Sequence, residues 1–266
     1  MTAIPIEDFA AAAKLPPVDG QAVFLGRMGY GVAWKLQQLV VEARQNGQIP
    51  DTLLLCEHDD VITLGRRQTG PANVLLRRFP IFEIERGGDA TYHGPGQLVG
   101  YPICFLRPGP DPAQPFGEQD LHGFLRALEE GLLHLLRLCG VACDRKPKYT
   151  GVWTADQTGK LVSLGVAVRR WVTSHGFALN VTTDLSRFLA INPCGMSAQV
   201  MTSLAALGVQ WDGKPVSVDA LIAPCAASLG ASLGRRFGLR SVEEAGLADL
   251  LRQAKQTPEL PAFSPG

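Results

Sequence analysis

Residues 86 to 97 read Arg-Gly-Gly-Asp-Ala-Thr-Tyr-His-Gly-Pro-Gly-Gln, the most informative stretch of the chain. Four glycines and a proline among twelve residues argue against a regular helix or a central strand, because both residue types destabilise them. Glycine also lets a ligand approach the main chain closely. Apolar, strand-like segments flank the stretch, so its polar side chains are expected on a glycine-shaped loop held by strands. Such a loop is typical of a binding site, although an ordinary polar turn is also compatible with it.

The composition is that of a globular protein with ample material for a core. Hydrophobic residues make up 46% of the 266 residues, charged residues make up 19%, and the formal net charge is zero. No overall field therefore attracts nucleic acid or an anionic membrane, and neither is expected as a partner. The first residues lack the basic and apolar regions of a signal peptide, and apolar runs are short. We expect a cytoplasmic protein with reduced thiols.

Apolar periodicity predicts strands mainly in the first 181 residues and helices after them, which favours an α+β fold with a mixed, largely antiparallel sheet flanked by helices. Pro102 places its strand at a sheet edge or a bulge. We divide the chain into an N-terminal arm (1–20), a single catalytic domain (21–240) and a C-terminal helix with a Pro-rich tail (241–266). Helices are expected over residues 31–45, 120–138, 217–233 and 242–255, and strands over 52–56, 61–64, 81–84, 97–106, 152–154, 160–168 and 171–181.

Cys194 is the candidate nucleophile, because it stands between a proline and a glycine and is expected on a tight turn. The other cysteines fall in or beside apolar elements, and buried cysteine usually behaves as a small hydrophobe. No metal site is expected, because Cys139 and Cys143 have no further ligand pair at metal spacing. The five cysteines interpreted as core residues are Cys56, Cys104, Cys139, Cys143 and Cys225.

A cysteine attacks only as a thiolate and therefore needs a cation or a base nearby. Lys160 opens an otherwise apolar strand, and an amine beside the thiol would lower the pKa of the thiol. A solvated lysine at a strand end is the plainer interpretation, since lysine is usually exposed. His58, His93 and His175 are alternative bases, as in a Cys-His protease, but the local signatures of cysteine proteases are absent.

Several segments together resemble the lipoyl(octanoyl) transferase family. They occur in the family's order between residues 25 and 235, and the twelve-residue loop is the most specific of them. The matching segments are Glu57-His58 with Leu64-Gly65-Arg66, the loop 86–97, Gly159-Lys160-Leu-x-Ser-Leu-Gly165, Arg170-Trp171 with His175-Gly176-x-Ala-Leu-Asn180, and Pro193-Cys194-Gly195.

This resemblance implies the fold of the biotin and lipoate protein ligase catalytic domain. It implies transfer of an octanoyl group from acyl carrier protein to a lysine of a lipoyl domain, without a cofactor, as the first step of endogenous protein lipoylation. The implied acceptors are the lipoyl domains of 2-oxoacid dehydrogenase E2 subunits and the glycine cleavage H protein. A monomer is expected.

The family's Pro-Cys-Gly cysteine carries the acyl group as a thioester and its Gly-Lys lysine lowers the pKa of that thiol, so these roles fall on Cys194 and Lys160. Asp59, Asp60 and Ile62 stand where the family often has a proline and an aromatic residue, which leaves the acyl-chain preference open. The family's substrate-contacting positions fall on Arg86, Gly87, Gly88, Asp89, Ala90, Thr91, Tyr92, His93, Ser163, Leu164, Gly165, Gly176, Phe177 and Ala178, with His58 and Tyr101 near the acyl group. Candidate walls for an apolar acyl slot are Leu164, Val166, Phe177 and Leu179.

Other functions remain open. An ATP-dependent lipoate or biotin protein ligase would share the expected fold, but the Gly-Arg-Gly-Arg adenylate loop of biotin ligases is absent, and lipoate ligases require no cysteine at position 194. A non-catalytic scaffold for lipoyl domains would not need Lys160 and Cys194. A cysteine hydrolase would release free octanoate without an acceptor protein.

Overall fold

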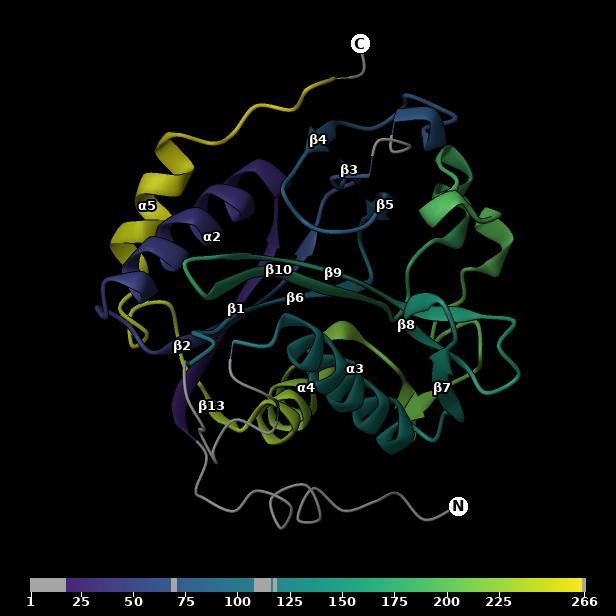
Figure 1. Ribbon diagram of the computed structural model, residues 1–266. Coiled ribbons are helices and arrows are strands. Elements are labelled where there is room, and N and C mark those ends of the chain that lie inside the picture. The colour runs from purple at the N-terminus through teal and green to yellow at the C-terminus, as the bar shows by residue number, and fades with distance from the viewer. Residues whose placement is uncertain (1–17, 68–70, 108–115, 117–118, 265–266) are drawn as a thin grey trace.

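Eight strands form one sheet that crosses the molecule in the computed structural model, which describes residues 18–67, 71–107, 116 and 119–264 (Figure 1). The strands are β1 (Val18–Met28), β2 (Asp51–His58), β6 (Gln97–Ile103), β7 (Cys143–Lys146), β8 (Tyr149–Thr154), β9 (Lys160–Arg169), β10 (Val172–Asn180) and β13 (Arg235–Leu239). Their order is β13-β1-β2-β6-β10-β9-β8-β7. β1 pairs in parallel with β13 and β2, and the remaining neighbours are antiparallel. The expected mixed, largely antiparallel sheet is confirmed.

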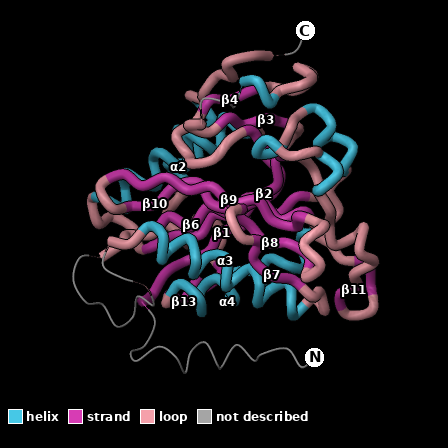
Figure 2. Tube along the Cα trace, turned by 45° about the vertical axis from the view of Figure 1, so that its right-hand side comes forward, coloured by secondary structure: helices cyan, strands magenta, loops and turns pink. Residues whose placement is uncertain are grey.

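Helices cover both faces of this sheet (Figures 1 and 2). α2 (Tyr30–Gln45) and α5 (Ala248–Gln256) lie on one face, and α3 (Leu121–Leu138) and α4 (Val218–Leu233) lie on the other. α3 begins where the sequence predicts, because Asp120 accepts a hydrogen bond from Gly123 N and caps the helix. None of the helices in the described ranges has the length and apolar character needed to cross a bilayer.

The middle of the sheet is buried on both faces. Leu53 and Leu55 of β2 pack in the core formed with α3 and α4, whereas Leu54 and Cys56 pack in the core formed with α2. Side chains alternate along a strand, so a strand that is covered on both faces is apolar at every position. This explains the continuous apolar run that predicted β2.

A second, three-stranded sheet forms a separate layer above one end of the large sheet (Figure 1). It consists of β3 (Val61–Leu64), flanked by β4 (Ile81–Glu83) in parallel and β5 (Ala90–His93) in antiparallel pairing. β5 lies inside the stretch 86–97, so the expectation of a loop over all twelve residues is wrong. Ala90–His93 contains no glycine and pairs with β3, while the glycines on either side form the irregular segments that the composition predicts.

Pro102 does not place β6 at an edge, because β6 lies between β2 and β10. The register between β6 and β10 ends at Gly100. Pairing resumes at Cys104, whose carbonyl accepts from Thr173 N at 2.9 Å and whose N–H donates to Thr173 Oγ1 at 2.9 Å. The proline, which lacks an N–H, therefore stands where the β6–β10 pairing is interrupted. The bridge between Phe105 and Val172 keeps the register that Gly100 and Phe177 have, so the expected bulge is absent as well.

β1, β7 and β13 are strands that the sequence does not predict. The helix expected from Val242 begins only at Ala248, because turns occupy residues 242–246 and end at Gly246 with φ +70°. The domain boundaries at residues 20 and 240 stay predictions, and residues 1–17 lie outside the described residues. The remaining elements are β11 (Gln210–Trp211), β12 (Lys214–Pro215) and the 3-10 helices η1 (Pro71–Asn73), η2 (Leu185–Ala190), η3 (Pro193–Gly195) and η4 (Ala198–Val200).

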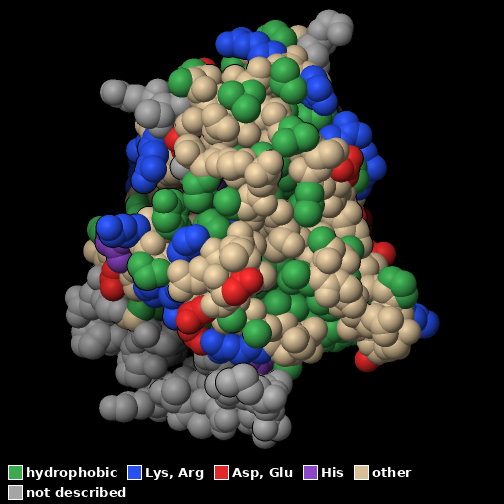
Figure 3. Space-filling model, turned by 90° about the vertical axis from the view of Figure 1, so that its right-hand side faces the viewer, with side chains coloured by type: hydrophobic (Ala, Val, Ile, Leu, Met, Phe, Trp, Pro, Cys, Tyr) green, Lys and Arg blue, Asp and Glu red, His purple; other side chains and the backbone are tan. Residues whose placement is uncertain are grey.

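The distribution of charged side chains on the surface agrees with the formal net charge of zero. Figure 3 shows basic and acidic side chains scattered over the face that carries β7 and β8, without a separation by sign.

Candidate active site

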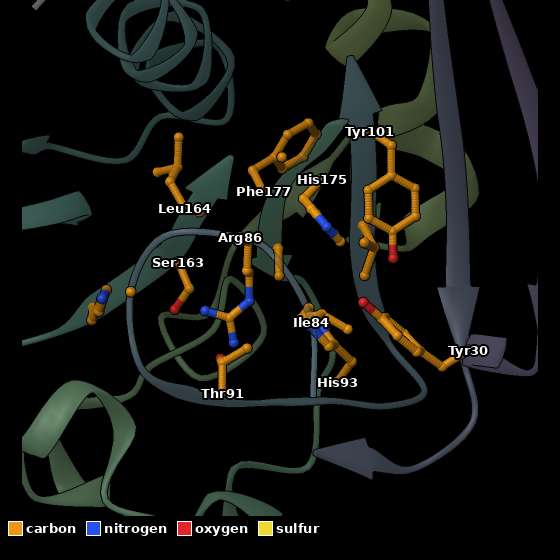
Figure 4. Close-up of a pocket in the computed structure, with 16 residues that line it drawn as sticks. Tyr30, Ile84, Arg86, Thr91, His93, Tyr101, Ser163, Leu164, His175 and Phe177 are labelled. Carbon is orange, nitrogen blue, oxygen red and sulfur yellow. The ribbon is translucent and has the colours of Figure 1, made fainter. Parts of the chain in front are cut away.

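A narrow cavity of about 40 Å³ lies between the glycine-rich stretch and the β9–β10 pair (Figure 4). The antiparallel register places Ser163, Leu164 and Gly165 opposite Ala178, Phe177 and Gly176, and all six residues line the cavity. From the other side it is lined by Arg86, Gly88, Thr91 and His93. The fold therefore brings together three segments that the sequence singled out separately. We call this cavity the slot.

The rest of the stretch 86–93 shapes the slot without lining it. Alternation along β5 turns Thr91 and His93 toward the slot and sends Ala90 and Tyr92 into a separate core with Phe188. The carboxylate of Asp89 accepts from Ala90 N and from Asn73 Nδ2. Gly87 N donates to Val166 O at 3.0 Å and ties the stretch to β9.

Arg86 is buried and fixed beside β9. Its Nη2 donates to Thr63 O at 2.8 Å and to Thr63 Oγ1 at 2.9 Å. Gly165 makes room for it, because a Cβ at this position would lie 3.0 Å from Arg86 Cδ and 2.8 Å from Gly87 O. Arg86 therefore places a permanent cation in the wall of the slot.

Two neutral histidines lie near the slot. His58 Nδ1 lies 3.0 Å from Met28 O and its Nε2 lies 2.6 Å from the hydroxyl of Tyr101, which lines the slot. A carbonyl can only accept, so Nδ1 donates and Nε2 accepts from Tyr101. Burial lowers the pKa of His58 to about 4 and that of His93 to about 3. The Tyr30 ring stacks on His93 with the ring centres 6.0 Å apart.

Lys160 lines the slot at the first position of β9 and is only 2% exposed. The plainer interpretation of a solvated lysine is therefore wrong. Its Nζ lies 5.7 Å from the centre of the Trp153 ring. Its backbone O accepts from Thr202 N at 3.0 Å, so the start of β9 is joined to the segment that follows η4.

Cys194 stands in the short turn η3, as the sequence predicts. Gly195 has φ +73° and its N–H donates to Asn192 O at 3.1 Å. η3 lies against β5, which supplies Thr91 and His93 to the slot. The same segment continues to Met201, which forms a parallel bridge with Lys160. The Cys194 side chain lies outside the described part of the structure, so its pairing with Lys160 stays a prediction.

The other five cysteines are buried and unpaired, which confirms their interpretation as core residues. Burial raises the pKa of each of these thiols, to about 11 for Cys143 and to about 12 for Cys139. These thiols therefore remain protonated and unreactive near neutral pH.

Some slot residues were missed by the sequence analysis. Of the four candidate walls, Leu164 and Phe177 line the slot, but Val166 and Leu179 belong to the core with α3 and α4. His175 was considered only as a base, although its place before Gly176 in a matching segment was a usable signal. Tyr30, Ile84 and Val99 also line the slot. Tyr30 begins a helix and the other two are apolar residues in or beside strands, so nothing in the sequence marked them as site residues.

Comparisons with known proteins show the family of the chain. A family model described as lipoyl protein ligase A/B catalytic domain matches residues 29–230. The octanoyltransferase of Geobacter metallireducens is 48% identical over 193 residues, which cover 72% of this chain and 83% of that protein. The octanoyltransferase of Geotalea uraniireducens is 49% identical over 183 residues, which cover 68% and 80%.

Solved structures share the fold. Lipoate-protein ligase A bound with ATP aligns with a TM-score of 0.69 and 16% identity over 90% of this chain and 95% of that chain. The bipartite lipoate protein ligase of Thermoplasma acidophilum, described together with its E2 lipoyl domain, aligns with a TM-score of 0.66 and 17% identity over 90% and 93%. At these identities the likeness concerns the fold alone, and it agrees with the ligase-like architecture that the sequence predicts.

Proposed function

The chain belongs to the lipoyl protein ligase A/B catalytic domain family, and we propose that it transfers an octanoyl group from acyl carrier protein to a lysine of a lipoyl domain through a thioester on Cys194. It is an acyltransferase with octanoyl transfer as its activity, because relatives that are 45% to 49% identical are octanoyltransferases. The donor, the acceptor and the covalent route are the proposed part.

The observation that carries the covalent route is the buried Lys160 at the wall of the slot. An amine in this place can lower the pKa of a nearby thiol and can accept its proton. The segment that begins at the Cys194 turn returns to pair with Lys160 through Met201, which supports placing thiol and amine at the same end of the slot.

The first step is a thioester exchange. Lys160 accepts the proton of the Cys194 thiol, and the resulting thiolate attacks the carbonyl carbon of the octanoyl thioester. The new C–S bond to Cys194 forms, the C–S bond to the carrier breaks, and the carrier's thiolate leaves and takes up the proton from Lys160. One thioester replaces another, so no ATP is needed. In the second step the neutral amine of the acceptor lysine attacks the Cys194 thioester. The amide bond forms, the C–S bond breaks, and Lys160 or the released thiolate accepts the ammonium proton.

The slot offers apolar surface for the chain. Leu164, Phe177, Val99 and Ile84 contribute to its walls, and each methylene that they bury stabilises the complex by about 0.8 kcal/mol. The slot of about 40 Å³ has room for a few water molecules, because a cavity needs about 10–15 Å³ on this measure to hold one.

The proposed acceptors are the lipoyl domains of 2-oxoacid dehydrogenase E2 subunits and the glycine cleavage H protein, and the chain is proposed to act as a monomer. A lipoate protein ligase of the same fold is described together with its E2 lipoyl domain, which supports a lipoyl domain as the acceptor here.

Intact-mass measurement tests the route. After incubation with octanoyl acyl carrier protein, the wild type should gain one octanoyl group, and Cys194→Ser should gain none. Cys225→Ala is the matched control, because it removes a buried thiol far along the chain in α4 and should leave the adduct. Addition of a lipoyl domain without ATP should then move the mass to that domain. An octanoyl adduct on Cys194→Ser, or transfer that starts only with ATP, contradicts the route.

A further inference from the structure

A buried chain of side-chain hydrogen bonds runs from the wall of the slot to the segment that follows the Cys194 turn. It begins at His93, which lines the slot and whose Nδ1 lies 2.8 Å from Gln97 Oε1. Gln97 Nε2 donates to Asn180 Oδ1 at 2.9 Å, and Asn180 Nδ2 donates to Thr202 O at 2.9 Å. Gln97 and Asn180 are each only 1% exposed. These bonds join β5, β6 and β10 to the backbone at Thr202.

The direction of the bonds is fixed by two backbone carbonyls, which can only accept. The amide nitrogen of Asn180 has to face Thr202 O, so its Oδ1 faces Gln97. Gln97 Nε2 also donates to Tyr92 O at 3.3 Å, so Gln97 Oε1 accepts from Nδ1 of His93. Asn180 stands directly opposite Gln97 in the β6–β10 register. Its side chain therefore has one orientation that satisfies both neighbours, and turning it would leave buried polar groups unpaired.

Thr202 belongs to the segment that returns from the Cys194 turn to Lys160. Its N–H donates to Lys160 O at 3.0 Å, and the preceding residue, Met201, forms the parallel bridge with Lys160. Asn180 also accepts from Leu204 N at 3.0 Å through its own backbone carbonyl. Thr202 is thus held between Lys160, which accepts from its N–H, and Asn180, which donates to its carbonyl.

Little chain separates this anchor from the Cys194 turn. Only residues 196 and 197 lie between η3 and η4, and Met201 follows η4 directly. Both turns are closed by backbone bonds, because Met196 N donates to Pro193 O at 3.1 Å and Met201 N donates to Ala198 O at 3.1 Å. Two short, closed turns in succession carry the position of the anchor to the Cys194 turn.

We propose that Asn180 is a positioning residue for acyl transfer, because its bond to Thr202 O holds the Cys194 turn where Lys160 can take the proton of the thiol. The proposal rests on the proposed function, since it takes Cys194 and Lys160 as the reacting pair. Asn180 does not line the slot, so it acts through the backbone of Thr202 and not on the substrate.

Asn180→Ala tests this role by two measurements on the full-length protein. The rate of octanoyl-adduct formation, followed by intact mass with octanoyl acyl carrier protein, should fall about tenfold or more, because small misplacements of reacting groups are costly. The pH midpoint of iodoacetamide alkylation at Cys194 should rise toward that of Lys160→Ala, since the thiol is no longer held beside the amine. Asn180→Leu, which fills the space without hydrogen bonding, provides a second variant if a thermal melt shows that the alanine variant folds poorly.

The double variant Asn180→Ala with Lys160→Ala separates positioning from general destabilisation. If Asn180 acts through the amine, the double variant should have the alkylation midpoint of Lys160→Ala alone, because no amine remains to be paired with the thiol. A midpoint that rises further, by as much as Asn180→Ala raises it in the wild type, means that Asn180 acts independently of Lys160 and overturns the proposal.

Thr173→Val is the matched control, because Thr173 is also buried in β10 and bonded to neighbouring backbone. Its hydroxyl donates to Pro102 O at 2.6 Å and accepts from Cys104 N at 2.9 Å, but it does not line the slot. The control should keep the wild-type adduct rate and alkylation midpoint. Equal losses in Thr173→Val, or wild-type values in the Asn180 variants, overturn the positioning role. A wild type that gains no octanoyl group instead refutes the proposed function, and the positioning role with it.

Discussion

Gly151 leaves the space that the Lys160 side chain occupies. A Cβ at position 151 would lie 2.9 Å from Lys160 Cε and 2.4 Å from Val162 O, and the residue has φ +129°, where L side chains are strained. Gly151 N donates to Glu129 Oε1 at 3.1 Å, and Glu129 is fully buried. The position of the Lys160 amine therefore depends on the neighbouring strand as well as on its own.

Gly151→Ala should displace Lys160 and lower the rate of acyl-adduct formation at least tenfold. The strained backbone should also reduce the free energy of unfolding by about 1–3 kcal/mol. Adduct mass against time and chemical denaturation measure the two effects. Gly208→Ala is the control, because Gly208 also has a positive φ, +70°, but no atom within 4 Å of an added Cβ. Equal loss of acylation in both variants would mean that backbone strain alone, without displacement of Lys160, explains the result.

Lys160→Ala should raise the pH at which Cys194 becomes reactive, because the thiol loses the amine that is proposed to lower its pKa. The rate of alkylation by iodoacetamide against pH measures this midpoint. Lys146→Ala is the control, because Lys146 Nζ lies 4.3 Å from the centre of the same Trp153 ring but does not line the slot. The proposed pairing of amine and thiol fails if the Lys160 variant keeps the wild-type profile.

Acid should destabilise the protein through His58. Burial lowers its folded pKa to about 4, while an unfolded histidine has a pKa of about 6.5. The unfolded chain therefore binds more protons in this window, and stability present above about pH 6.5 is lost as the pH falls toward 4. At about 1.4 kcal/mol per pKa unit, the loss is on the order of 3 kcal/mol. Urea denaturation from pH 7 to pH 4.5 measures it.

His58→Gln should flatten this pH dependence relative to the wild type, since glutamine does not titrate. His122→Gln serves as the control, because His122 is exposed on α3 and should leave the slope unchanged. If the free energy of unfolding of the His58 variant depends on pH as it does in the wild type, other groups cause the acid sensitivity. His93 is the first of these to test, because burial lowers its pKa to about 3.

Local patterns predicted the elements whose causes are local. An amphipathic period predicted α3, and apolar runs predicted β2 and β9. β1 was missed because Asp19 and Gln21 interrupt its apolar pattern and because its partner β13 lies more than two hundred residues away in the chain.

In the candidate site, too, features with local causes were predicted and features that depend on neighbouring strands were not. The glycine-rich stretch and the Gly176–Ala178 segment were predicted from their motifs, and both line the slot. The burial of Lys160 was not predictable, because it depends on Gly151 in a neighbouring strand. The place of His175 in the wall of the slot depends on strand register and on a left-handed backbone, neither of which composition or spacing reveals.

Gly165 sets the distance between β9 and the glycine-rich stretch, so Gly165→Ala should narrow or distort the slot. The added Cβ would press on Gly87 O at 2.8 Å and on Arg86 Cδ at 3.0 Å, and overpacking of this kind destabilises by about 1–3 kcal/mol. We expect kcat/KM for octanoyl transfer to fall at least tenfold. Gly238→Ala is the matched control, because Gly238 also lies in a strand but has no atom within 4 Å of an added Cβ. If Gly165→Ala is destabilised yet transfers octanoyl as fast as the control, close contact between β9 and the stretch is needed for folding only.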